Sequence, residues 1–100
     1  MPTPLAADQY DADDLLELLH AHRELKQLRV RRRGVLLTIE SGTKSDPAAH
    51  ARLRRATKQI WTLEVATHTG SWQLTGQRGS MSELVGMLVH QFPWVLTPVG

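Results

Sequence analysis

The hydrophobic pattern along the chain changes its period, and each period predicts a different kind of element. From Leu15 to Leu25 apolar residues recur every three to four positions, which is typical of one face of a helix. Asp11 is suited to cap the start of this helix, because its side chain can accept a hydrogen bond from a free backbone N–H. The pattern predicts a helix over residues 12–27.

From residue 28 onward the period falls to two, which is the repeat of a half-buried strand. Apolar and polar residues alternate in short segments that are separated by turn sequences. The expected strands are residues 28–33, 35–40, 49–56, 60–67 and 71–75. Gly34 is expected to form the turn between the first two of them. Consecutive strands of this kind predict an antiparallel meander with one polar face.

The end of the chain becomes helical again. In "GSMSEL", Ser80 and Glu83 have the spacing of a capping box, and an apolar stripe continues to Leu88. Pro93 is expected to end this helix. "WVLTP", residues 94–98, reads as a short last strand at a sheet edge.

The resulting fold class is α+β, with the order α-β-β-β-β-β-α-β. We expect an antiparallel sheet of four to six strands that carries both helices on one face. Residues 1–7 are expected to be a flexible tail, and 8–100 a single domain. Alternation assigns to the helix-covered side Val35, Leu37, Ile39, Ala49, Ala51, Leu53, Trp61, Leu63, Val65, Trp72 and Leu74. It assigns to the polar side Arg29, Arg31, Arg33, His50, Arg52, Arg54, Thr62, Glu64, Gln73 and Thr75.

Composition narrows the class of protein further. The chain has 100 residues, 41% of them hydrophobic, and it has no cysteine, which excludes disulfides and thiol chemistry. Its longest apolar stretch is too short to cross a bilayer. Its acidic start lacks the pattern of a secretory signal, so we expect a cytoplasmic protein.

Charge is distributed very unevenly along the chain. Residues 1–25 hold six acidic residues and one arginine, a net charge of −5. Residues 26–60 hold ten basic and two acidic residues, a net charge of +8, and the remainder has a net charge of −1. Such blocks indicate either an anionic partner or pairing between two parts of one chain.

The basic block gives the candidate binding site. Four of the five residues at positions 29–33 are arginines, and alternation sends three of them to the polar face. Arg32 is the exception, and we expect it to reach toward the start of the first helix. The predicted nucleic-acid-binding residues are Arg29, Arg31, Arg33, Arg52, Arg54 and His50. Because the tryptophans follow the inward phase, we expect contacts to the nucleic-acid backbone with little sequence preference.

Three other interpretations of the arginines stay open. They can be solvated charge that protects a sheet edge from aggregation. They can also pair with the acidic residues of the first helix. Third, the chain can be a protein-interaction or regulatory module that binds another protein or a second copy of itself, with Phe92, Trp94 and Leu96 as aromatic and apolar anchors.

Catalytic patterns are weak, and we expect neither enzymatic activity nor a cofactor. No phosphate-binding glycine loop and no nucleophile or metalloprotease motif is present. His50 and His68 could approach each other across a hairpin near Asp46, but two histidines and one aspartate occur together often by chance. We therefore predict no metal site.

Two segments resemble parts of double-stranded-RNA-binding domains. "GTKSDPAAHARL" is similar to the proline-histidine loop of that family, and "GQRGSMSEL" to its glycine-rich start of the second helix. The resemblance would assign RNA contacts to His50 and Arg78. The lysine pair of that family is absent, since Met81 and Ser82 occupy those positions, and an extra strand is expected after the first helix.

Overall fold

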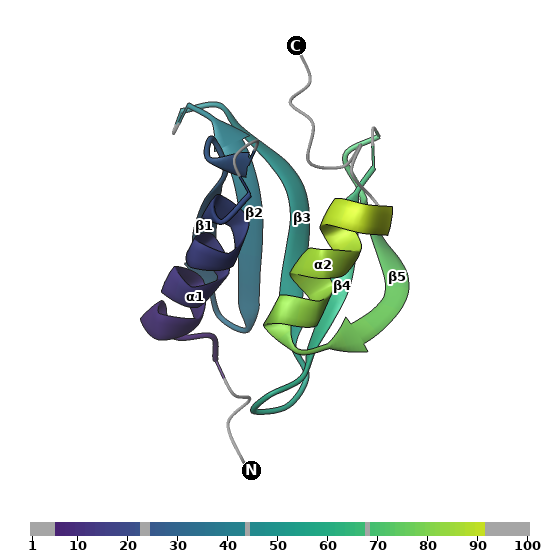
Figure 1. Ribbon diagram of the computed structural model, residues 1–100. Helices are drawn as coiled ribbons and strands as arrows, with labels where there is room; N and C mark the ends of the chain where they lie inside the picture. Colours follow the sequence, from purple (N-terminus) through teal and green to yellow (C-terminus); the bar gives the residue numbers. More distant parts are fainter. Residues whose placement is uncertain (1–5, 23–24, 44, 68, 92–100) are drawn as a thin grey trace.

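The computed structural model describes residues 6–22, 25–43, 45–67 and 69–91. Helix α1 (Gln9–His20) comes first and helix α2 (Met81–Gln91) last. Between them lie the strands β1 (Arg29–Arg33), β2 (Leu36–Gly42), β3 (Pro47–Arg55), β4 (Trp61–Ala66) and β5 (Trp72–Gly79). The strands form one antiparallel sheet in chain order, and both helices lie on the same face of it (Figure 1). The predicted α+β class is confirmed.

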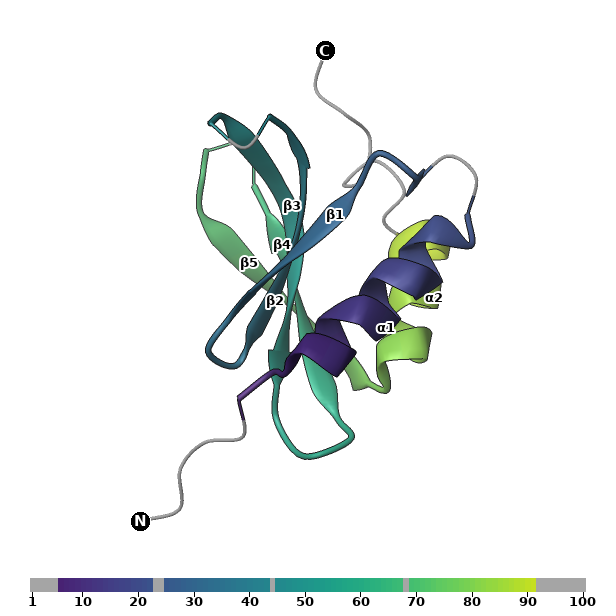
Figure 2. The same ribbon diagram turned by 90° about the vertical axis from the view of Figure 1, so that its left-hand side faces the viewer.

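The second face of the sheet carries neither of these helices, as the view along the sheet shows (Figure 2). The core therefore lies entirely between the helices and one face of the sheet. Its fully buried side chains are mostly leucines from every layer: Leu15, Leu19, Leu28, Leu37, Ile39, Leu53, Leu63, Leu84 and Leu88. Leu37, Leu53 and Leu63 are partners across β2, β3 and β4, so one row of cross-strand contacts forms the centre of the core.

Helix α1 begins earlier and ends earlier than the sequence pattern predicts. Asp8, not Asp11, is the N-cap, and Asp11 is its partner in a capping box in which each side chain accepts a bond from the other's backbone N–H. The helix ends at His20, whose ring nitrogen lies 2.8 Å from the carbonyl oxygen of Leu28. Leu25 is buried beyond the end of the helix, so a turn rather than a longer helix brings it to the core.

The turn between β1 and β2 is confirmed at Gly34. Arg33 pairs with Leu36, which leaves a connection of two residues. Gly34 has φ +57, a conformation that other residues adopt at a cost, and glycine is favoured at the first position of such hairpin turns.

A bulge in β3 makes the expected phase wrong for two residues. Ile39 pairs with Ala51 but Glu40 pairs with Ala49, so the register shifts at His50, which is the extra residue of the bulge. The extra residue shifts the alternation. As a result Ala49, expected in the core, is exposed, and His50, expected on the polar face, is buried.

The phase of β5 is also the reverse of the prediction. Trp72 pairs with Ala66 and Leu74 with Glu64, so both apolar side chains lie on the face without helices. Gln73 is the partner of the core residue Val65 and therefore shares the helix side. Thr75 follows the same phase as Gln73, and its hydroxyl donates to the carbonyl of Leu63 at 2.9 Å.

The start of α2 agrees with the predicted capping box. The backbone N–H of Glu83 donates to the Ser80 hydroxyl at 3.2 Å, and the backbone N–H of Ser80 donates to the Glu83 carboxylate at 3.1 Å. Phe92, Trp94, Leu96 and the predicted strand 94–98 lie outside the described residues. No helix in the described part of the chain is long and apolar enough to cross a membrane.

Candidate nucleic-acid interface

The face of the sheet opposite the helices carries the predicted arginines, and we call it the open face. Cross-strand partners point to the same side of a sheet, so the pairing register identifies its members. They are Arg29, Arg31, Arg33, Leu36, Thr38, Glu40, Ala49, Arg52, Arg54, Thr62, Glu64, Ala66, Trp72, Leu74 and Arg78. Six arginines and two glutamates give this face a net formal charge of +4.

Glu64 lies near the middle of the open face and binds two arginines. Its carboxylate oxygens accept hydrogen bonds from Arg52 at 2.9 Å and from Arg54 at 3.1 Å. The Glu64 side chain is 5% exposed, whereas those of Arg52 and Arg54 are 18% and 45% exposed. The two guanidinium groups therefore cover the carboxylate and remain closer to solvent themselves.

These contacts change the acidity of Glu64. Burial raises the pKa of its carboxyl group, but the hydrogen bonds from Arg52 and Arg54 and the charges of both arginines outweigh burial. The pKa of Glu64 therefore lies below its ordinary value of 4.5, and the carboxylate is ionised at neutral pH.

Glu40, on β2, also lies close to two arginines, but among the described residues it accepts a hydrogen bond only from Arg29. Its carboxylate oxygens lie 3.1 Å from Nε of Arg29 and 3.6 Å from Nε of Arg31, and its side chain is 7% exposed. Arg29 also donates to the backbone carbonyls of Gly42 and Thr43, which fixes its guanidinium at the end of the β2–β3 hairpin. Arg31 is held less closely and its side chain is 57% exposed.

Two arginines of the open face have no ion pair among the described residues. Arg33 and Arg78 lie in one cross-strand row with Arg54 between them, on β1, β5 and β3. Both are exposed. With strands about 4.8 Å apart, neighbouring arginines in this row are separated by about two strand spacings. The row presents three guanidinium groups across the full width of the sheet.

An aromatic ring also lies on the open face, where the sequence pattern did not place one. The guanidinium carbon of Arg52 is 4.3 Å from the centre of the Trp72 ring, which is a cation–π contact. Leu74 follows two residues later on the same face and is 72% exposed. The side of the open face near β5 is therefore partly apolar.

His50, predicted to be part of the site, does not reach the open face. Its ring Nε2 is 2.7 Å from the Ser41 hydroxyl, and both residues are buried. Because His50 lies within β3 and its ring is covered, it does not correspond to an exposed loop histidine that contacts RNA. The expected phase of His50 is therefore wrong, its burial gives no support to the predicted role in binding, and its contact with Ser41 indicates a structural role.

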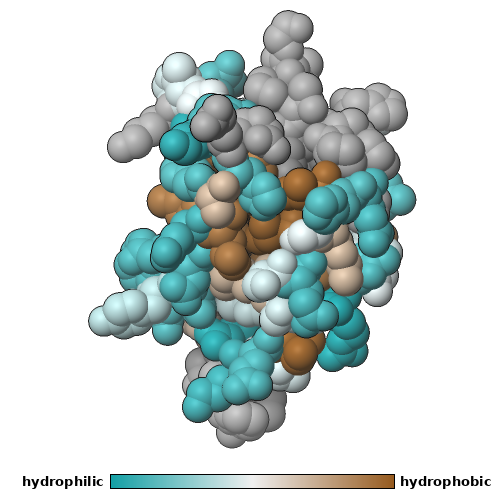
Figure 3. Space-filling view, in the orientation of Figure 1, coloured by the Kyte–Doolittle hydropathy of each residue, from teal (hydrophilic) through white to brown (hydrophobic). Residues whose placement is uncertain are grey.

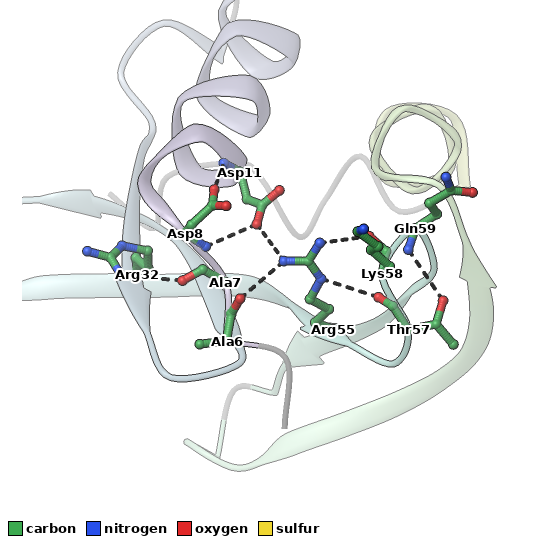
Figure 4. A network of polar contacts seen from close by, with 9 residues as sticks. All are labelled: Ala6, Ala7, Asp8, Asp11, Arg32, Arg55, Thr57, Lys58 and Gln59. Atoms are coloured by element: carbon green, nitrogen blue, oxygen red, sulfur yellow. Dashed lines mark hydrogen bonds and ion pairs between the residues drawn. The ribbon is translucent and has the colours of Figure 1, made fainter. Parts of the chain in front are cut away.

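The alternative pairing with α1 involves a different arginine. Arg55, whose side chain is 12% exposed, donates to the Asp11 carboxylate at 2.8 Å and to the backbone carbonyl of Ala6 at 3.1 Å. It also donates to the carbonyls of Thr57 and Lys58 in the β3–β4 turn (Figure 4). Arg32 donates to the Ala7 carbonyl at 3.3 Å, near the start of α1, as expected.

The helix side of the molecule has the opposite character. A groove of about 640 Å³ lies between α1, α2 and the β3–β4 turn. Its lining includes the acidic residues Asp14 and Glu17 and the apolar residues Leu18, Trp61 and Met81. Apolar side chains gather between the two helices in the space-filling view (Figure 3). The molecule therefore has a basic face and, on its other side, an apolar groove with an acidic rim.

The structure adds little to the metal-site hypothesis for His50, His68 and Asp46. Within the described residues, no three histidine, aspartate or glutamate side chains are grouped so that they could hold a metal ion. His68 lies outside the described residues, and His50 is buried against Ser41.

Comparison with known proteins finds no matching family model, no matching curated protein and no matching solved structure.

Besides Ala49, sequence reasoning missed three side chains of the open face that bear on binding. Trp72 and Leu74 were assigned to the core because they are apolar, and Arg78 entered only through the family resemblance. One available signal was the length of the β4–β5 connection, residues 67–71, which sets the register of β5 against β4.

Proposed function

We propose that this protein is a small non-catalytic binding module that contacts the backbone of a nucleic acid through its open face. The observation that carries the proposal is the net charge of +4 on a sheet face without helices, with Arg33 and Arg78 exposed and unpaired in the described residues. Clustered guanidinium groups neutralise phosphates and release the counterions that surround a nucleic acid.

The two buried glutamates lower the net positive charge of the open face, but they also hold arginine side chains in place. Glu64 fixes Arg52 and Arg54 against the sheet and Glu40 fixes Arg29, so less side-chain entropy is lost when a phosphate binds there. An arginine has five N–H donors, and one or two bonds to a carboxylate leave others for a second anion. Arg31 and Arg54, the more exposed member of each pair, are the side chains best placed to use them.

The test is the salt dependence of binding to mixed-sequence DNA and RNA. Wild-type protein should bind at low salt, and the logarithm of affinity should fall linearly with the logarithm of salt concentration. The double variant Arg33→Gln, Arg78→Gln should bind more weakly, with a slope that is flatter by about one to two units. Because both side chains are exposed, the variant should unfold at the same denaturant concentration as the wild type.

The matched control is Lys26→Gln with Lys58→Gln. It removes the same amount of charge, but both lysines are exposed and lie outside the strands. An affinity loss confined to the arginine variant supports the open face as the site. Equal losses of affinity in the two variants would show that only the net charge of the protein matters. No binding by the wild type at low salt would refute the proposal.

A second function, a protein-interaction module, is favoured by the groove between α1 and α2. Its acidic rim and apolar floor are complementary to a helical segment with a basic side and an apolar side. A synthetic leucine-lysine helix should then bind, and a leucine-glutamate helix with the same apolar face should not. Leu18→Asp should abolish this binding, and sedimentation measurements would show whether the groove instead accepts a second copy.

A further inference from the structure

We infer that the nucleic acid taken by the open face is single-stranded, and that Trp72, Arg52 and Leu74 form a site where an unpaired base stacks. This inference rests on the proposed function and names the class of nucleic acid. It follows from the position of Trp72, whose ring lies on the basic face rather than in the core.

The stack of Arg52 on Trp72 is held in a fixed position. Glu64 accepts a hydrogen bond from Arg52 at 2.9 Å, and the guanidinium carbon of Arg52 is 4.3 Å from the ring centre of Trp72. The Arg52 side chain is 18% exposed and Trp72 is partly exposed, so a planar group can reach the open part of this pair from the solvent side. Unpaired bases stack on arginine planes as well as on aromatic side chains.

Leu74 extends the same surface. It is the cross-strand partner of Glu64, and it lies two residues from Trp72 on the same side of β5. Leu74 is 72% exposed, which leaves it free to contact a base. Together, the three side chains provide a partly apolar surface beside Arg78, which has no ion pair among the described residues.

A duplex could use the arginines but not this surface. The flat faces of paired bases are covered by their neighbours in the stack, and only phosphates, sugars and base edges are accessible. In a single strand the base faces are free, so one side of the chain can contact guanidinium groups while a base covers the stack. The arrangement therefore favours a single strand over a duplex that makes the same number of phosphate contacts.

The experiment compares three probes of equal length: a thymidine homopolymer of about 12 nucleotides, an abasic strand with the same phosphates, and a duplex. The wild type should bind the thymidine strand about tenfold or more tightly than the abasic strand. Trp72→Leu should remove this difference, Leu74→Ala should reduce it, and Trp72→Phe, which keeps a ring, should retain most of it. Binding of the abasic strand should be equal in all four proteins.

The outcomes separate this inference from the proposed function. If the wild type binds the thymidine and abasic strands equally, or if Trp72→Leu weakens both by the same factor, the stacking site is refuted and backbone binding stands. If the duplex binds as tightly as the thymidine strand, the preference for single strands is refuted. If none of the probes binds at low salt, the proposed function itself fails. Leu74→Ala remains informative if Trp72→Leu does not fold, because Leu74 is exposed.

Discussion

Replacing Glu64 with glutamine tests the balance of charge on the open face. The change keeps the size of the side chain and one carbonyl acceptor but removes the negative charge that holds Arg52 and Arg54. Losing one partner of a fully buried ion pair costs about 3–5 kcal/mol, whereas exposed pairs contribute about 0–1 kcal/mol. Arg52 is largely buried and Arg54 is 45% exposed, so solvent screens the second contact. We expect the free energy of unfolding to fall by about 1–3 kcal/mol at neutral pH.

The pH dependence of stability is an independent test of the contribution of Glu64. Because the pKa of Glu64 in the folded protein lies below its ordinary value of 4.5, its contribution to stability is complete above that pH. It is lost as pH falls through the lowered pKa, where the folded protein takes up the proton. The difference in stability between wild type and Glu64→Gln should therefore be constant from about pH 6 to pH 8 and shrink below about pH 4.5.

The assay is urea unfolding followed by circular dichroism across this pH range. Glu17→Gln is the control, because Glu17 is an exposed residue of α1 and should have little effect at any pH. The same Glu64→Gln protein should bind nucleic acid more tightly than the wild type, because losing one negative charge raises the net charge of its open face by one unit. Equal stability of variant and wild type at pH 7, or a difference that persists unchanged to pH 3, would refute the role assigned to Glu64.

Three further substitutions test the fold. Leu63→Ala should lower the free energy of unfolding by about 2–5 kcal/mol, because Leu63 is 1% exposed in the central row of the core, and a near-zero loss in chemical denaturation would contradict that placement. Ser80→Ala should cost about 1 kcal/mol in the same assay, since the backbone N–H of Glu83 loses its acceptor, and a neutral result would place the start of α2 elsewhere. Arg55→Lys should cost about 1–3 kcal/mol, because a lysine cannot reach Asp11 and three backbone carbonyls together; unchanged thermal stability would show that the network is dispensable.

The order and kind of the elements could be read from the sequence because they depend on local periodicity. The alternation in residues 28–40 predicts both β1 and β2, and the capping box at Ser80 and Glu83 predicts the start of α2. Strand alternation also placed Arg29, Arg31, Arg52 and Arg54 on one face, because cross-strand neighbours share a side.

Two features of the site depended on how the strands pair. The bulge at His50 changes which side its ring occupies, and a bulge is a property of two strands rather than of one. The phase of β5 was decided by its register against β4, which places Trp72 opposite Ala66. Alternation alone establishes that Trp72 and Leu74 share a side, and the assumption that apolar residues face the core selected the wrong one.

By itself, the sequence determined the succession of helices and strands, the grouping of the arginines and the absence of thiol chemistry. These follow from the identity and spacing of neighbouring residues. Only the tertiary structure decided that Glu40 and Glu64 each hold two arginines, that Arg55 rather than the β1 arginines binds α1, and that Trp72 stacks under Arg52. Such contacts join residues that are distant in the chain, and their partners are fixed by register and packing, which no local pattern encodes.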